Sequence, residues 1–179
     1  KLVRERETAT GYRYCAPIFR SHDIFGITRV DILHAELHGT GMLKRHFLML
    51  YSFFNSKMIE ELGKRLKSVL KMRLSSLKSF HAQQWDMIFR TSPILFYGIV
   101  KGDFLRCWIL HLKYYRLLRC YHWTTTMQQH LVSIFNEFIT IFKQTYSVQD
   151  LSYPNFHAVV ECIRDCERDE ISPVHWWTQ

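Results

Sequence analysis

Glycine and proline are scarce in this chain, which has 7 glycines and 4 prolines among its 179 residues. Both residues mark turns, so a chain with few of them is typical of long elements joined by few loops, and hence of helices. Hydrophobic residues make up 47% of the sequence, which is enough for one sizeable buried core. We therefore expect residues 1–179 to form a single helical domain. Because the chain begins with Lys1, we also expect it to be a fragment of a larger protein.

Apolar residues recur at the three- and four-residue spacing of amphipathic helices along most of the chain. The stripes are Leu43, Phe47, Leu50, Tyr51 and Phe54; Ile59, Leu62, Leu66 and Leu70; Trp85, Ile88 and Phe89; Phe104, Trp108, Leu112 and Tyr115; and Leu131, Ile134, Phe135, Phe138, Ile141 and Phe142. A first helix that is interrupted at residues 39–41 and a last helix at 155–168 complete the set. The pattern predicts an all-α fold of seven or eight helices with one short β-strand.

Five positions carry signals for the start of a helix. Ser56, Asp103 and the threonine run at residues 124–126 each precede an apolar stripe and are predicted to cap a helix N-terminus. Ser92-Pro93 combines a capping residue with proline at the first helical position, and Pro154 opens the last helix in the same way.

The predicted strand is the β-branched run at residues 27–32, and no strong second strand lies nearby to pair with it. At the end of this run Asp31 and His34 are three residues apart, so on a helix both side chains would lie on one face. A carboxylate that orients an imidazole, or shares a proton with it, is a common element of phosphoryl-transfer sites. The alternative is that Asp31 caps a helix and His34 packs or faces solvent.

The formal net charge is +8, and the isoelectric point is about 9.4. Such an excess favours a polyanionic partner, most often nucleic acid. The candidate phosphate-binding residues are Lys64, Lys67, Lys71, Arg73, Lys78, Lys113 and Arg116. A solvated helix face is the alternative for each run of charges. The longest apolar runs, at residues 93–100 and 107–110, are too short to span a membrane, so no membrane partner is expected.

Four aromatic residues interleave with the basic residues of the predicted helix that begins near residue 104. Tyr114, Tyr115, Tyr121 and Trp123 could stack on nucleic-acid bases. Their helical spacing also suits side chains of the core, so both interpretations stay open.

The five cysteines are scattered, and a chain of this apolar content needs no disulfides, which indicates a reducing compartment. On helices, Cys107 would share a face with His111, and Cys162 would share one with Cys166. Two such pairs could form a tetrahedral zinc site if their helices pack together. The alternative is that these side chains simply pack in the core.

The acids near apolar segments are Asp23, Asp31, Glu36, Asp86 and Asp103. Two-metal phosphoryl transfer needs about three converging acids, and spacing brings together at most Asp31 and Glu36. The sequence has neither a glycine-rich phosphate loop nor a nucleophile elbow. We therefore expect an incomplete catalytic set and no cofactor in this chain.

Several short motifs, taken in order, resemble a known family. Residues 16–18, Asp31-Ile-Leu-His34 and Leu37-His-Gly39 resemble the Asp-x-x-His segment of eukaryotic cut-and-paste transposases, in particular the CACTA and Kyakuja-Dileera-Zisupton groups. The further matches, in the family's order, are Trp85 with Arg90, residues 93–96, 103–118, 153–157 and 172–177. The resemblance covers roughly residues 16–179.

In that family an RNase H-like core holds three catalytic acids, and an all-helical insertion separates the second acid from the third. The resemblance implies that this chain is mostly the insertion, with one core strand at residues 27–32. The first two acids would lie before residue 1 and the third after residue 179. Asp31 and His34 would then be accessory residues beside the active site of the parent protein.

The resemblance also implies a DNA partner and a nuclear location. Mg²⁺ would serve only a complete parent transposase, and a homo-oligomer is compatible with the family. Two departures, Ser172 in place of the usual glycine and the polar residues 165–167, imply a decayed or domesticated copy.

The function expected on these grounds is that of a transposase-derived, DNA-binding helical domain that is catalytically incomplete on its own. One alternative is part of an active metal-dependent DNA transposase, whose remaining acids a parent chain would supply. The other is a helical protein-interaction module without nucleic acid, which would expose an apolar groove and an evenly mixed charge surface.

Overall fold

The computed structural model describes residue 36 and residues 41–120, 124–148 and 154–169, and of residues 154, 155 and 165–169 only the backbone. The elements are α4 (Met42–Ser52), α5 (Ser56–Arg65), the π-helical turn η2 (Leu66–Leu70), the 3-10 helix η3 (Leu74–Ser79), α6 (Ala82–Leu95), α7 (Gly102–Leu118), α8 (Thr125–Tyr146) and α9 (Pro154–Asp169). Because η2 continues α5 without a break, this part of the chain forms seven helical segments and no strand. The all-α prediction is confirmed, and the strand predicted at residues 27–32 lies outside the described residues.

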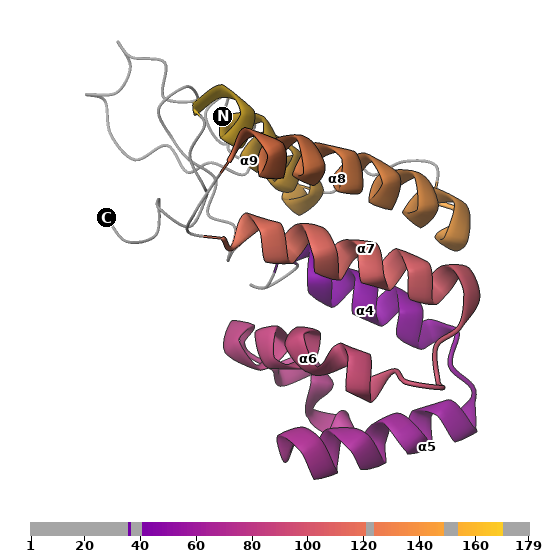
Figure 1. The fold of residues 1–179 in the computed structure, drawn as a ribbon. Coiled ribbons are helices and arrows are strands. Elements are labelled where there is room, and N and C mark those ends of the chain that lie inside the picture. Colours follow the sequence, from indigo (N-terminus) through magenta and orange to yellow (C-terminus); the bar gives the residue numbers. More distant parts are fainter. Residues whose placement is uncertain (1–35, 37–40, 121–123, 149–153, 170–179) are drawn as a thin grey trace, which may run out of the picture.

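Helix α7 lies in the middle of the arrangement, with α8 and α9 to one side of it and α4, α6 and α5 to the other (Figure 1). It packs along α8 over much of its length. The buried members of the predicted stripes are Leu43, Phe47, Leu50, Leu62, Leu66, Trp85, Ile88, Phe89, Trp108, Leu112, Tyr115, Leu131, Ile134, Phe135, Phe138 and Phe142. The helical spacing of the apolar residues therefore identified most of the core correctly.

Two of the predicted helix starts are confirmed. Thr124 caps α8, and its Oγ1 accepts a hydrogen bond from the Met127 N–H at 3.2 Å. Helix α9 begins at Pro154, where the missing N–H of proline costs no helical hydrogen bond.

Two other predicted caps are wrong in detail. Asn55, rather than Ser56, caps α5, and its side-chain oxygen accepts the Met58 N–H at 3.0 Å. Asparagine and serine cap helices about equally well, so the sequence alone did not separate the two neighbours. Asp103 lies in the first turn of α7, one residue inside a helix whose N-cap residue is Lys101. In that turn its negative charge still interacts favourably with the helix dipole.

Ser92-Pro93 does not start a helix, because both residues lie in the last turn of α6. Proline has no N–H to donate to the carbonyl four residues earlier, which is that of Phe89. The Ser92 hydroxyl donates to this carbonyl instead, at 2.6 Å, and accepts a hydrogen bond from Trp108 Nε1 at 2.8 Å. The fully buried Ser92 thus compensates for the proline and ties α6 to α7. The prediction was wrong because the same dipeptide suits both a helix start and this internal substitution.

This arrangement predicts the effect of Ser92→Ala. The substitution leaves the buried Trp108 Nε1 without its acceptor and the Phe89 carbonyl without its donor. We expect the free energy of unfolding to fall by about 2–3 kcal/mol, the cost of leaving buried polar groups unsatisfied. Urea denaturation followed by tryptophan fluorescence measures the change. Ser133→Ala on the exposed face of α8 is the control, with an expected change within about 0.5 kcal/mol. Equal effects of the two substitutions would contradict the role of Ser92.

Candidate nucleic-acid interface

Residues 62–85 contain six lysines and arginines and no acid. They span the end of α5, the turn η2, the helix η3 and the start of α6. The six are Lys64, Arg65, Lys67, Lys71, Arg73 and Lys78, and all except Arg65 are exposed. This stretch, which we name the basic segment, contains five of the seven candidate phosphate-binding residues.

The backbone of the basic segment is irregular but anchored. Helix α5 widens into the π-helical turn η2 and ends at Lys71, which has a left-handed backbone with φ 57°. The N–H groups of Lys71 and Met72 both donate to the Leu66 carbonyl, as at many helix ends. The buried side chains that anchor the segment are Leu66, Met72, Leu77 and Phe80. With its apolar residues held in the core, the segment turns its cations toward solvent.

Four cations of the basic segment are outside any ion pair with the residues that the structure describes, namely Lys67, Lys71, Arg73 and Lys78. The two glutamates before the segment are already matched with other partners. Glu60 contacts Lys64 at 2.7 Å, and the hydrogen bond from Lys64 lowers the pKa of Glu60. Glu61 contacts Arg65 Nε at 2.8 Å. The four cations are therefore available to an external anion.

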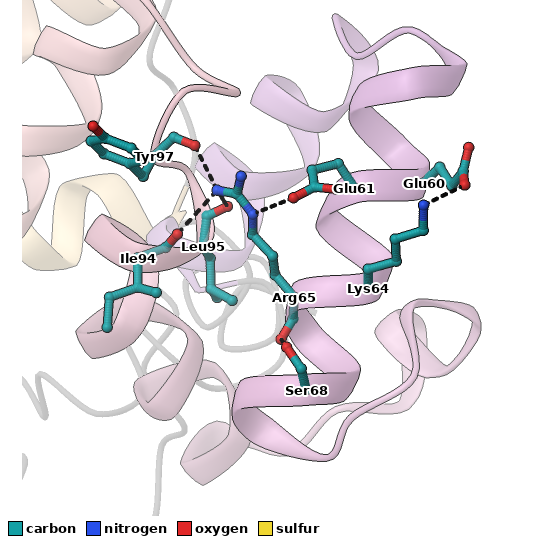
Figure 2. A network of polar contacts seen from close by, with 8 residues as sticks. All are labelled: Glu60, Glu61, Lys64, Arg65, Ser68, Ile94, Leu95 and Tyr97. Carbon is teal, nitrogen blue, oxygen red and sulfur yellow. Dashed lines mark hydrogen bonds and ion pairs between the residues drawn. The ribbon is translucent and has the colours of Figure 1, made fainter.

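Arg65 has a structural task at this site. Its Nη1 donates to the carbonyl oxygens of Ile94 and Leu95, both at 3.2 Å, and of Tyr97 at 2.5 Å (Figure 2). These carbonyls belong to the C-terminal end of α6 and the residues just after it, where a positive charge interacts favourably with the helix dipole. Arg65 thus fastens the end of α5 to the end of α6 and holds the start of the basic segment in place.

The other two candidates lie on α7. Lys113 and Arg116 belong to its narrow exposed stripe, together with Arg106 and Ile109. Helix α6 runs in the opposite direction to both α5 and α7, so α5 and α7 are parallel (Figure 1). The C-terminal half of α7 therefore lies at the same end of the bundle as the basic segment, which follows α5. The structure therefore brings both groups of candidates to one end, although α6 separates their helices.

The remaining predicted site residues do not join this interface. Asp31 and His34 lie outside the described residues, as do Tyr121 and Trp123. The alternative of base stacking is wrong for Tyr114 and Tyr115, because both are buried in the core.

The structure does not support the proposed zinc site. Both ring nitrogens of His111 are already hydrogen-bonded, at 2.8 Å to His46 Nδ1 and at 2.9 Å to Glu36 Oε2, so neither is available to a metal ion. Burial raises the pKa of Cys107 to about 12, which disfavours the thiolate that zinc requires. Cys162 is buried, and the side chain of Cys166 is outside the described part. Within that part, no group of three or more His, Cys, Asp or Glu side chains could hold a metal ion.

A buried polar chain was not foreseen from the sequence. It links Glu36, which precedes α4, to His111 on α7, His46 on α4 and Tyr146 at the end of α8. One signal was present: His46 and His111 each occupy a position on the apolar stripe of its helix. Their mutual contacts depend on the packing of three helices and have no local signature.

Comparison with protein-family models, with curated proteins and with solved structures found no match to this chain. Among the described helices, none has the length and apolar character needed to cross a membrane.

The role of Arg65 can be tested with Arg65→Met, which keeps the length of the stem and removes the charged donors. We expect the free energy of unfolding to fall by about 1–2 kcal/mol, because the end of α6 loses its charged hydrogen-bond partner. Chemical denaturation monitored by circular dichroism measures it. Lys64→Met, one residue earlier, removes only an exposed ion pair and should leave the stability close to that of the unchanged protein. If the two variants were equally stable, Arg65 would not fasten α5 to α6.

Proposed function

We propose that this chain is a DNA-binding helical module whose basic segment contacts the phosphate backbone. The observation that carries the proposal is the group of four exposed cations, Lys67, Lys71, Arg73 and Lys78, outside any ion pair within the described part of the chain. Each phosphate that a lysine or arginine neutralises releases counterions, so binding of this kind is strong at low salt and carries little sequence information.

Two further features of the segment support phosphate contacts. Two exposed serines between the cations, Ser75 and Ser76, offer hydroxyl groups of the kind that often bond to phosphate oxygens. Lys71 occupies a left-handed position at which glycine is the usual residue. A non-glycine residue there costs of order 1–3 kcal/mol. A lysine at that cost is consistent with a use for its charge, one part of which is the hydrogen bond from Lys71 Nζ to the Ser68 carbonyl at 3.2 Å.

The origin that we propose for this module rests on the sequence resemblance. It would be the helical insertion of a cut-and-paste transposase, working in the nucleus and without the catalytic acids of the parent enzyme. Asp31 and His34 would be the remnant of the accessory motif beside that active site. Sequencing the gene upstream of residue 1 and downstream of residue 179 tests this origin, because intact acids on both sides would instead indicate an active transposase.

One observation favours the alternative of a protein-interaction module. At the C-terminal end of α6, Ile94 is 61% and Tyr97 80% exposed. Exposed large apolar residues of this kind often belong to contact surfaces. This function predicts no binding to DNA at any salt concentration, so the same experiment separates the two.

The proposal predicts a salt-dependent affinity for duplex DNA. Fluorescence anisotropy with a short labelled duplex, between about 50 and 200 mM salt, should give a linear fall of log K with log salt. The variant in which Lys67, Lys71, Arg73 and Lys78 are all changed to Gln should bind at least about tenfold more weakly at low salt. Its slope should be shallower by about 0.9 for each phosphate that the variant no longer neutralises.

A charge-matched variant is the control for this experiment. Changing Lys57, Lys101, Lys143 and Arg164 to Gln removes the same charge from exposed positions elsewhere. It should retain most of the affinity and an almost unchanged slope. A separate variant with Lys113→Gln and Arg116→Gln tests whether the exposed stripe of α7 contributes. Equal losses of affinity in the two fourfold variants, or no binding to DNA at low salt, would overturn the proposed interface.

A further inference from the structure

Four side chains from separate parts of the sequence form a continuous buried chain of hydrogen bonds. Glu36 Oε2 lies 2.9 Å from His111 Nε2, the Nδ1 atoms of His111 and His46 are 2.8 Å apart, and His46 Nε2 is 3.0 Å from the Tyr146 hydroxyl. Tyr114 donates to the other Glu36 oxygen at 2.7 Å. Glu36, His111 and His46 are fully buried, and Tyr146, 8% exposed, is the outer end of the chain.

The contact between the two imidazoles must contain a proton. Two nitrogen lone pairs at 2.8 Å would repel each other, so one of the two Nδ1 atoms carries a hydrogen and the other accepts it. The ring planes are within 5° of each other, which suits a hydrogen bond in the plane of both rings. Burial, and then the neighbouring His111, lower the pKa of His46, so His46 is neutral and has a single N–H.

With a neutral His46, and with Tyr114 donating to Glu36 Oε1, two arrangements of protons satisfy every contact in the chain. In the first, the Tyr146 hydroxyl donates to His46 Nε2, His46 Nδ1–H donates to His111 Nδ1, and His111 Nε2–H donates to the Glu36 carboxylate. In the second, His111 Nδ1–H donates to His46 Nδ1, and His46 Nε2–H donates to the Tyr146 oxygen. A proton between His111 Nε2 and Glu36 then completes the second arrangement, which contains one proton more than the first.

We propose that Glu36, His111, His46 and Tyr146 form a binding site for one proton, and that its uptake reverses the His111–His46 and His46–Tyr146 hydrogen bonds. A solvent proton reaches the Tyr146 oxygen, the tyrosine proton passes to His46 Nε2, and the His46 Nδ1 proton passes to His111. The proton taken up neutralises the buried Glu36–His111 pair. The Tyr146 oxygen keeps the solvent proton, which now points away from His46 Nε2, at the end of α8 where Phe53 and Phe104 pack around the ring.

Among the residues that the structure describes, the groups around the buried chain do not compete for this proton. On α7, burial raises the pKa values of Tyr114, Tyr115 and Cys107, and the nearby Glu36 adds to the effect on both tyrosines, so all three stay neutral. On α6, Phe89 packs against His111, while Asp86 bonds to Tyr115 and to arginines. Helix α8 presents the apolar rings of Phe138 and Phe142 to His46.

Imidazole nitrogen NMR on the full 179-residue chain tests this proposal. A long-range ¹H–¹⁵N spectrum, recorded from about pH 8 down to the onset of acid unfolding, reports which nitrogen of each histidine is protonated. We expect His46 and His111 to change together in one step with a common midpoint. Across that step the His46 proton should move from Nδ1 to Nε2, and His46 should not become an imidazolium. The exposed His130 and His157 provide the comparison signals in the same spectrum.

The results that would overturn the proposal are distinct. They are separate midpoints for His46 and His111, an imidazolium at His46 in the folded protein, or no change in either ring before unfolding. The variant Glu36→Gln provides a second readout, because it keeps the size of the side chain and removes the charge that the proton neutralises. We expect its common midpoint to move at least one pH unit lower. A midpoint at the wild-type value in this variant would contradict the assignment of the proton to the Glu36–His111 pair.

Discussion

The burial of α7 on nearly all sides is the constraint on which the rest of the structure depends. A helix that is apolar around most of its circumference must be enclosed by other elements. Only a narrow stripe through Arg106, Ile109, Lys113 and Arg116 is exposed, and the other sides pack on α4, α6 and α8. The enclosed side includes Trp108, whose indole N–H needs a partner in the core and finds it on α6. The polar contacts of α7 thus specify how the neighbouring helices are aligned with it. Apolar packing alone would allow more than one alignment.

The same enclosure accounts for the arrangement of charge. The buried sides of α7 are apolar, so the basic residues lie at the surface of the bundle. They are found on the exposed stripe of α7 and on the basic segment after α5. Arg65 is the exception, because it lies partly buried and joins two helix ends. One arginine therefore positions the segment, while the lysines and arginine that follow it remain available.

Most of the helical fold could be predicted from the sequence, because spacing and caps are local properties. The apolar stripes and the starts at Thr124 and Pro154 depend on residues within a turn or two of each other. Ser92-Pro93 failed because its meaning depends on Trp108, which is sixteen residues away. The basic segment could be identified residue by residue, but its π-helical turn could not be foreseen. The contacts between Glu36 and α7 join residues that are 75 or more positions apart. They could not be predicted, because no local pattern indicates which distant helix a residue will contact.

The π-helical turn at Leu66–Leu70 has a consequence for how this chain tolerates change in length. Such a turn holds one residue more than the α-helical turn that it replaces. A chain one residue shorter here would close the turn with ordinary helical hydrogen bonds, at about 100° of rotation per residue. The tighter turn covers nearly the same total angle with one residue fewer, so the chain beyond it would keep its direction and Met72 its place in the core. A relative that lacks this residue should therefore lose one side chain from the surface of the turn and keep the buried anchors on both sides of it.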